Sequence, residues 1–272
     1  MISLLGVALD ANSSHLLGPA EGPAAIREAL HSNSHNHCTE AAVPVLDHLD
    51  DVGDVAVAND KGSITDADLI TAAVSHQLDA GRQIITLGGD HSITYPILRA
   101  FKSHHDHLTV VHIDAHPDIY HDLDNNPLSH GSPFARALED GCMTTLVQLG
   151  IRTSTPHQLE QVKRWGVTVV SPRQLAGFDV SALPGPIYLS IDLDGLDPSV
   201  APGVSHHEPG GLTMREVLDI IDALPGPVVG ADVVELNPCR DMVGMTAMVA
   251  AKLVKEIAGA MLIRAIYPDT DP

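Results

Sequence analysis

The sequence predicts a three-layer α/β fold built on one doubly wound, mostly parallel sheet. Short apolar segments rich in β-branched residues alternate along the chain with longer segments whose apolar residues recur at helical spacing. Several of the short segments are followed at once by acidic residues and histidines, as is typical of strand ends in a parallel sheet. No linker or internal repeat interrupts the pattern, so we expect a single domain over residues 1–272.

Each element is expected from its own local pattern. The expected strands are short, apolar and β-branched, namely Ile2–Leu9, Gln83–Leu87, Leu108–Ile113, Thr145–Leu149, Val167–Val170, Pro186–Ile191 and Val228–Val234. The expected helices carry apolar residues three and four positions apart and cover residues 23–30, 66–80, 214–224 and 244–263, with another helix beginning near Ser92. Residues 32–40 and 120–132 are polar and turn-rich, so we expect them to be loops.

Composition and charge restrict the possible partners. The chain has 35 acidic residues against 15 basic ones and a formal net charge of −20. Such a surface repels nucleic acid and anionic membranes and favours a small cationic partner. The sequence has no apolar run of about 18 residues, so we expect no membrane-spanning segment. The three cysteines, Cys38, Cys142 and Cys239, form no CxxC pair, which favours a reducing compartment and predicts a cytoplasmic location.

The segment HIDAHPDIYHD, residues 112–122, sets Asp114, His116 and Asp118 at alternate positions after an apolar strand. Alternate residues of an extended segment point to the same side, so these side chains are expected to crowd together. Two carboxylates and an imidazole at such close range repel and desolvate one another unless a positive charge lies between them. The motif therefore suggests a cation site, whereas His112 is expected to pack within the strand.

Three further strands are followed directly by polar residues. GGDHS supplies His91, DLDG supplies Asp192 and Asp194, and ELNP supplies Glu235. The carboxyl ends of parallel strands form the ligand crevice, so these side chains are expected to converge. The candidate metal ligands are His91, Asp114, His116, Asp118, Asp192 and Asp194. This set is too large for one tetrahedral zinc and suits two divalent ions about 3.5–4 Å apart, with manganese favoured by ligand hardness.

Each motif taken alone also has a purely structural interpretation. Asp-rich turns after strands are frequent, and GGDHS can be a tight turn that caps the helix beginning near Ser92. DLDG resembles the nucleophile motif of phosphatases, but that motif normally lies near the N-terminus and has a threonine where Leu196 stands here. The occurrence of all three motifs at strand ends of one α/β chain favours the metal site.

Together, GGDHS, DAHPD and SIDLDGLDPSVAPG resemble the metal-binding motifs of the ureohydrolases, the family of arginases and agmatinases. The resemblance covers nearly the whole chain, and segments such as SHGSPFARALE and VVGADVVELNPCRDMVGMTAMVAAKLVKE are most similar to plant-type arginases. It implies the arginase/deacetylase-like fold with two Mn²⁺ per chain. One ion would be held by His91, Asp114, Asp118 and Asp192, and the other by Asp114, His116, Asp192 and Asp194.

The resemblance also implies a reaction, in which a hydroxide between the metals attacks the carbon of a guanidinium group. His130, in SHGS, matches the family's proton-shuttling histidine, and Glu235 matches the carboxylate that holds the guanidinium. Asp118 is expected to be catalytic as well as a metal ligand. These roles agree with elementary chemistry, because two cations lower the pKa of a bridging water toward neutrality and a histidine can protonate the leaving amine.

Three positions depart from the pattern of animal arginases. Tyr120 stands where those enzymes have an asparagine that binds the substrate carboxylate, and Thr153 and Thr155 replace acidic residues that contact the substrate amino group. Glu208, in SHHEPGG, could supply a substitute carboxylate. The candidate substrate-binding residues are therefore Glu235, His130, Tyr120 and Glu208.

The sequence favours a hydrolase that cleaves a guanidino compound into urea and an amine, with L-arginine to L-ornithine as the leading reaction. Agmatine to putrescine is the main alternative because Tyr120 and the missing acidic residues favour it, and other guanidino acids such as guanidinobutyrate stay open. A zinc deacetylase-like enzyme would need one metal and fewer ligands. A catalytically silent regulatory relative would usually lack a ligand, His130 or Glu235. The resemblance also implies a homo-oligomer, either a trimer or a hexamer.

Overall fold

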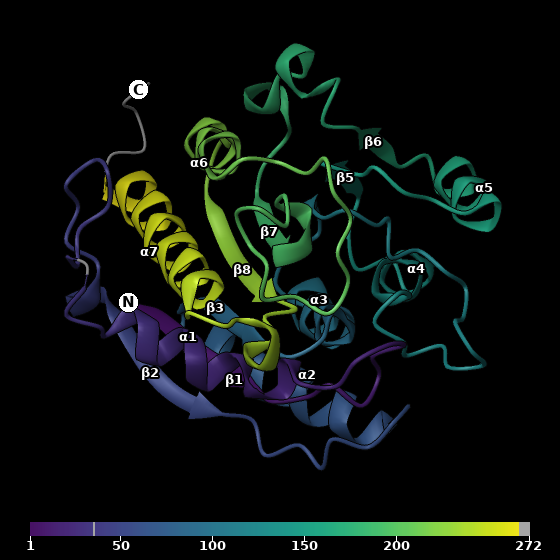
Figure 1. Ribbon diagram of the computed structural model, residues 1–272, viewed down its shortest axis with the longest axis horizontal. Helices are drawn as coiled ribbons and strands as arrows, with labels where there is room; N and C mark the ends of the chain where they lie inside the picture. Colours follow the sequence, from purple (N-terminus) through teal and green to yellow (C-terminus); the bar gives the residue numbers. More distant parts are fainter. Residues whose placement is uncertain (35, 267–272) are drawn as a thin grey trace.

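The computed structural model describes residues 1–34 and 36–266, and these form an eight-stranded sheet in the order β2-β1-β3-β8-β7-β4-β5-β6 (Figure 1). Every strand pairs in parallel with its neighbours. The strands are β1 (Ile2–Val7), β2 (Leu49–Asp54), β3 (Gln83–Gly88), β4 (Thr109–Ile113), β5 (Thr145–Leu149), β6 (Thr168–Val170), β7 (Ile187–Asp192) and β8 (Val228–Val234). The predicted α/β fold with a parallel sheet is confirmed.

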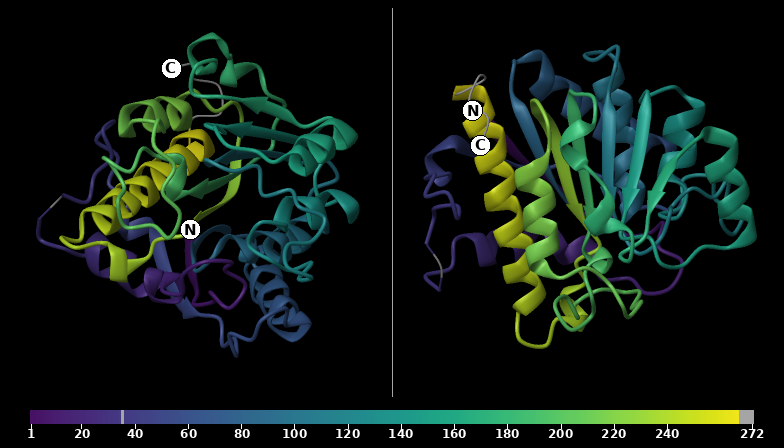
Figure 2. Two further views of the ribbon diagram at one scale, coloured as in Figure 1. Left: turned by 45° about the vertical axis from the view of Figure 1, so that its right-hand side comes forward. Right: turned by 90° about the horizontal axis from the view of Figure 1, so that it is seen from above.

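Helices cover both faces of the sheet and complete three layers (Figure 2). One face carries α1 (Gly22–Leu30), α6 (Met214–Ala223) and α7 (Met245–Ile266), and the other carries α2 (Ile64–Asp79), α3 (Thr94–Lys102) and α4 (Pro133–Glu139). A further helix, α5 (Pro156–Trp165), connects β5 to β6 and lies at that end of the sheet (Figure 1). No helix among the described residues combines the length and apolar character needed to cross a membrane.

The central strands are mostly apolar because both of their faces are covered. Successive residues enter opposite cores, so that Ile84 of β3 packs with α2 and α3 while Ile85 packs with α1 and α7. The same alternation separates Val110 from Val111 in β4. Most of the polar side chains of the site therefore follow the strand ends, and a few buried ones, His112, Ser190 and Asp232, lie within the strands.

Three elements were not predicted from the sequence, and each lacks the pattern that reveals the others. β2 reads LDDVGD, has little apolar character and forms an edge of the sheet beside β1. The helix α4 has only seven residues, too few to show a period. The helix α5 is mostly polar, although Thr155 and Gln158 form a capping box and Gly166 ends it with a φ of 65°. Those end signals could have identified it.

The two segments expected to be irregular contain no helix or strand where the structure describes them. His35, within the first segment, lies outside the described residues. The second segment, residues 120–132, leads from the end of β4 to the start of α4 and crosses the carboxyl edge of the sheet. It therefore reaches the region where the predicted site residues gather.

Candidate binuclear metal site and substrate pocket

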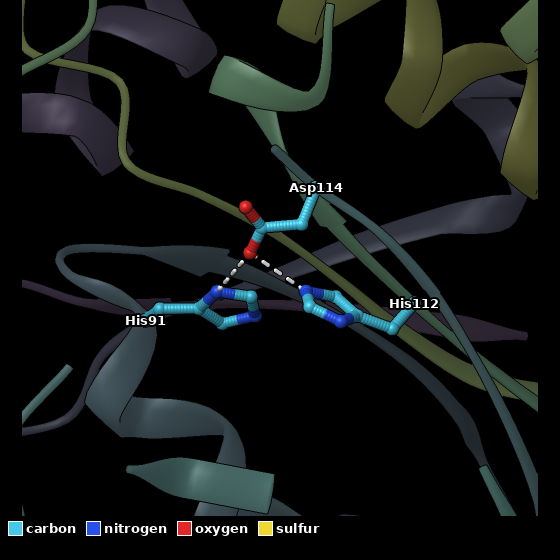
Figure 3. Close-up of side chains that lie close together, drawn as sticks. All are labelled: His91, His112 and Asp114. Atoms are coloured by element: carbon cyan, nitrogen blue, oxygen red, sulfur yellow. Dashed lines mark hydrogen bonds and ion pairs between the residues drawn. The ribbon is translucent and has the colours of Figure 1, made fainter. Parts of the chain in front are cut away.

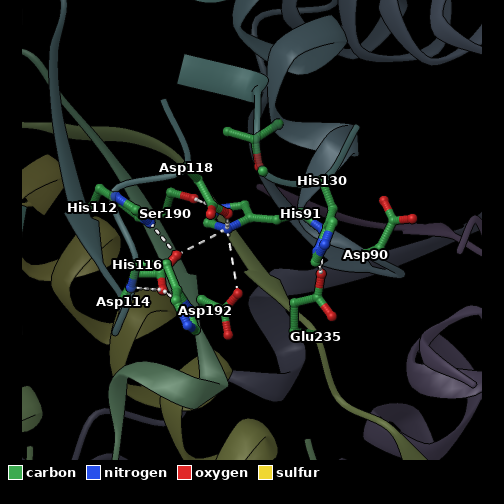
Figure 4. Close-up of polar contacts among 12 residues, drawn as sticks. Asp90, His91, His112, Asp114, His116, Asp118, His130, Ser190, Asp192 and Glu235 are labelled. Carbon is green, nitrogen blue, oxygen red and sulfur yellow. Dashed lines mark hydrogen bonds and ion pairs between the residues drawn. The ribbon is translucent and has the colours of Figure 1, made fainter. Parts of the chain in front are cut away.

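The predicted site residues follow four strands that are neighbours in the middle of the sheet, β3, β8, β7 and β4. His91 begins a 3-10 helix soon after β3, Glu235 follows β8, and Asp192 ends β7. The segment containing Asp114 and Asp118 follows β4. Adjacency of the four strands brings these groups to one point on the carboxyl edge (Figure 4).

Two of these residues have unusual backbone conformations. Asp118 has a φ of 45° and Glu235 a φ of 67°, in the left-handed region that residues with a side chain rarely adopt. Tertiary hydrogen bonds hold both positions: the Glu235 amide donates to the Gly89 carbonyl at 2.9 Å, and the Asp118 carbonyl accepts from the Phe134 amide at 3.3 Å. Strained backbone of this kind is concentrated at functional sites.

The first cluster is built around the Nδ1 atom of His91 (Figure 4). Carboxylate oxygens of Asp118, Asp114 and Asp192 lie 3.0, 3.2 and 3.4 Å from this nitrogen. The other ring nitrogen, Nε2, lies 2.9 Å from the Ser190 hydroxyl, whose proton goes to Asp232. This arrangement assigns the ring proton to Nε2, and the buried Nδ1 has no hydrogen-bond partner in the described chain. Its lone pair faces three carboxylates, as a metal ligand requires.

The second cluster contains Asp114, His116 and Asp194. Nδ1 of His116 lies 3.2 Å from Asp194 Oδ2 and 3.4 Å from Asp114 Oδ1. Burial opposes a charge on His116, but the carboxylates of Asp194 and Asp114 outweigh it and raise the pKa to about 12. Asp192 was expected in both ligand sets, yet its close contacts place it in the first cluster. Its Oδ1 accepts a hydrogen bond of 2.7 Å from the Asp194 amide.

Asp114 belongs to both clusters and is fully buried. Figure 3 shows its carboxylate between the rings of His91 and His112. His112 hydrogen-bonds this carboxylate, and its Nε2 lies 2.7 Å from Asp114 Oδ2. The opposite nitrogen of His112 lies 3.1 Å from the Gln148 side-chain amide, which is a donor, so His112 is neutral and donates from Nε2. Burial lowers the pKa of His112, in agreement with this state. The role of His112 was missed because its sequence context shows only a strand residue.

The charges of these buried groups fit two cations. Burial, with the charges of Asp194 and Asp114, raises the pKa of Asp192 well above its usual value. Burial, with the charge of Asp114, raises the pKa of Asp194 to about 7. The carboxylates thus repel one another and attract protons, and divalent ions would satisfy the same attraction. Carboxylate oxygens and imidazole nitrogens are also the donors that manganese-type ions take.

A pocket of about 340 Å³ opens beside the two clusters. All four predicted substrate-binding residues line it, as do several residues that the sequence did not indicate, including Ser14, His206, Ser154 and Gln158. His130 Nδ1 lies 3.1 Å from Glu235 Oε1, and its Nε2 lies 2.8 Å from the Ser14 hydroxyl. Burial disfavours the charged form of His130, but hydrogen bonding and attraction to Glu235 raise its pKa to about 9.

Comparison with known proteins places this chain in a family. The model of the arginase family matches residues 1–259. The chain belongs to the arginase family. It is 44% identical to the mitochondrial arginase of Medicago truncatula over 95% of this chain and 81% of the relative. It is 46% identical to mitochondrial arginase 1 of Arabidopsis thaliana over 94% of this chain and 80% of the relative.

Solved structures agree with this membership. The arginase from Medicago truncatula superimposes with a TM-score of 0.90 and 44% identity, covering 96% of this chain and 87% of that one. A mitochondrial agmatinase from Gallus gallus is a more distant relative, 36% identical over 94% of this chain and 79% of its own. Arginase-family proteins are hydrolases that act on guanidino substrates and depend on a binuclear metal centre.

The predicted cytoplasmic location of this arginase-family protein is wrong, because the plant arginases of Medicago truncatula and Arabidopsis thaliana that it matches are mitochondrial and point to an organelle. The prediction rested on the three cysteines, which are indeed unpaired. Unpaired cysteines indicate only that the fold needs no disulfide, and they do not distinguish the cytosol from the interior of an organelle.

Arg152 holds the turn that carries Asp194 in this arginase-family chain. Its guanidinium donates to the carbonyl of Asp194 at 2.6 Å and to that of Gly195 at 3.1 Å. It also donates to the Glu208 carbonyl at 2.8 and 2.6 Å. One side chain therefore joins the second metal cluster to a wall of the pocket. Only the fork of an arginine presents enough N–H groups to reach all these carbonyls.

Replacing Arg152 by methionine should weaken binding of the second metal ion by about 10- to 100-fold, the usual effect of removing a group that orients a ligand. The reason is that the carbonyl groups of the Asp194 turn lose the guanidinium that donates to them, while all the candidate metal ligands are still present. Calorimetric titration of chelator-stripped protein with Mn²⁺ measures this change. The exposed Arg173, changed to methionine, serves as the control. Equal affinities in the two variants would contradict the prediction.

Proposed function

We propose that this protein hydrolyses L-arginine to L-ornithine and urea with two Mn²⁺ per chain. The observation that carries the proposal is the pair of clusters sharing Asp114 beside a pocket lined by Glu235 and His130. Its similarity to plant arginases, at 44% and 46% identity, supports arginine over agmatine.

The six residues that would hold the two ions are His91, Asp114, His116, Asp118, Asp192 and Asp194, of which Asp114 belongs to both clusters. When bound, two divalent cations supply an activated water molecule as the nucleophile for the guanidinium carbon. Four carboxylates among six ligands favour manganese over zinc, which takes fewer and softer ligands in proteins. Asp118 contributes both to holding the metals and to the negative charge of the pocket floor.

Glu235 binds and orients the guanidinium group. Its Oε1 already accepts hydrogen bonds from the His91 amide at 2.9 Å and from His130 at 3.1 Å. Within the described residues Oε2 has no such partner, so it is available to the substrate. A carboxylate matches the planar N–H groups of a guanidinium and fixes its carbon for attack.

His130 supplies the proton that the leaving amine needs. With a pKa raised to about 9, its ring is protonated at neutral pH. Water adds to the guanidinium carbon, the bond from that carbon to the side-chain nitrogen breaks, and His130 protonates this nitrogen as it leaves. Water gives up two protons as its oxygen becomes the urea carbonyl: one restores the protonated ring of His130 and the other completes the ammonium group of ornithine. Hydrogen bonds to Glu235 and Ser14 keep the imidazole oriented for this transfer.

Two further residues complete the proposed substrate site. The Glu208 carboxylate lines the pocket, and the structure shows no ion pair for it within the residues it describes. We assign it to the α-ammonium group of the substrate. Tyr120 also lines the pocket, but its ring stacks on His157 with centroids 5.7 Å apart, so its contribution to binding is to support the start of α5.

Urea release by chelator-stripped protein reloaded with Mn²⁺ or Zn²⁺ tests the proposal, with L-arginine, agmatine and 4-guanidinobutyrate at equal concentrations. We expect the highest kcat/KM with Mn²⁺ and L-arginine. A higher kcat/KM with agmatine would contradict the assignment of L-arginine as the substrate. Absence of urea from all three compounds would contradict the proposed hydrolysis of guanidino compounds. The expected trimer or hexamer stays a prediction, which sedimentation velocity measures.

A further inference from the structure

The pocket has two chemically different ends. One end contains the two clusters and Glu235, and it is rich in carboxylates. The other is formed by the segment that begins α5 and contributes Thr153, Ser154, Thr155 and Gln158, none of which carries a negative charge. A substrate with a cationic group at one end and an anionic group at the other matches this polarity.

Gln158 is the informative residue at the neutral end. It is the third residue of α5, its side chain lines the pocket, and only 4% of the residue is exposed. Its Oε1 accepts from the Thr155 amide at 2.8 Å and from the Thr155 hydroxyl at 3.2 Å. Because a backbone amide can only donate, these bonds fix which side-chain atom is the oxygen and leave the NH₂ group as the free end.

The NH₂ group of Gln158 has no hydrogen-bond partner in the described part of the chain. The residue as a whole is 4% exposed, yet this NH₂ group is not among the fully buried atoms that lack a partner, so it keeps access to the pocket that Gln158 lines. An acceptor on a bound ligand can therefore pair with it. The hydroxyls of Thr153 and Ser154, which line the same wall, also lack partners among the residues described.

The position of these donors reinforces their preference for an anion. They lie at the N-terminus of a ten-residue helix, where the peptide dipoles give a partial positive charge. The start of this helix is fixed in place, because His157 stacks on Tyr120 and its Nε2 lies 3.3 Å from the His121 amide. Gly131 leaves room for that stack, since a Cβ there would lie 3.3 Å from the Tyr120 ring.

We propose that the N-terminus of α5, with the side-chain amide of Gln158 as its principal donor, binds the α-carboxylate of the substrate and selects arginine over decarboxylated guanidino compounds. This inference rests on the proposed arginine hydrolysis. Agmatine has no carboxylate, so it gains no hydrogen bond from the Gln158 NH₂ group, and a site built to hydrogen-bond one group of the substrate discriminates against an analogue that lacks that group.

The variant Gln158→Glu tests this with little disturbance of the fold. Glutamate is the usual partner of threonine in a capping box, so the bonds to Thr155 are retained while the free donor becomes a carboxylate oxygen. We expect KM for L-arginine to rise about tenfold or more with kcat nearly unchanged, because uniform substrate binding is lost. KM for agmatine should stay the same or fall.

Gln174 provides a matched control. Its Oε1 accepts from the Ser171 amide and hydroxyl at 3.1 and 2.7 Å, the same local motif, but the residue is exposed and does not line the pocket. Gln174→Glu should leave KM for both substrates unchanged. Equal KM values for L-arginine in the two variants would overturn the inference, as would an equal rise of KM for arginine and agmatine in Gln158→Glu.

Binding of the products separates this inference from the proposed function. Calorimetry on the Mn²⁺-loaded protein compares L-ornithine, which has the carboxylate, with putrescine, which does not. Gln158→Glu should weaken ornithine about tenfold and leave putrescine unaffected. Absence of urea release by the wild-type protein would reject the proposed function alone, whereas unchanged ornithine affinity in the variant would reject the carboxylate site alone.

Discussion

Asp114→Asn should reduce urea release by about 10³-fold, and the purified protein should contain less than two manganese ions per chain. The estimate follows because the metal centre lowers the barrier by several kcal/mol and each 1.36 kcal/mol is a factor of ten in rate. Asp114 is the one residue present in both clusters of the described chain, and it is fully buried. An amide at this position keeps the shape but loses the charge that both ions share.

Metal content measured by mass spectrometry and urea release measured with saturating L-arginine provide the two readouts. The control is Asp66→Asn, because Asp66 is a buried aspartate that binds the Ala58 and Asp60 amides away from the site. The control reports the general effect of neutralising a buried carboxylate. A fully active Asp114→Asn variant with two ions would contradict the shared-ligand assignment.

Glu235→Gln should retain the metals but reduce kcat/KM by about 10³-fold. The amide keeps an acceptor for the His91 amide, so the local backbone is preserved. The lost charge removes a charge-assisted contact to the guanidinium and lowers the fraction of His130 that is protonated, and these effects together account for this magnitude. Unchanged metal content distinguishes this variant from the loss of a ligand.

The same variant should change the pH profile in a defined direction. Burial lowers the pKa of His130, and attraction to Glu235 outweighs this and raises it to about 9. Without that charge the pKa of His130 falls, so the ring loses its proton at a lower pH. Activity of the variant relative to wild type should therefore be lower at pH 8 than at pH 6. A constant ratio across this range would show that Glu235 does not control the proton on His130.

The sequence predicted the parts of the site that depend on local patterns. His91, Asp114 and Asp192 each follow an apolar strand, so their position on the carboxyl edge was readable from the chain alone. The strands that carry these residues are parallel and lie close together in the middle of the sheet, so their carboxyl ends bring the side chains together. The contacts of His91 Nδ1 with Asp114 and Asp192 show this. β2 was not predicted because an edge strand needs neither two apolar faces nor a regular alternation of apolar and polar residues.

Other parts of the site depend on contacts between distant segments and could not be predicted. Ser14 reaches His130 across 116 residues, and Gln148 orients His112 from the neighbouring strand. Arg152 contacts carbonyl groups, which leave no signature in the side-chain sequence. Gln158 could be recognised as a helix-capping residue, but its free NH₂ group appears only when the pocket is known.

The location of the two halves of the site affects how this protein can change over time. The two clusters and Glu235 depend on four central strands whose separation would require opening the middle of the sheet, so the chemistry is tied to the most cooperative part of the fold. The neutral end of the pocket belongs to α5, which precedes the three-residue β6 at the margin of the sheet. Substitutions at that margin can alter which guanidino compound is bound while leaving the catalytic residues unchanged. The same fold can therefore acquire new substrate preferences and keep its hydrolytic chemistry.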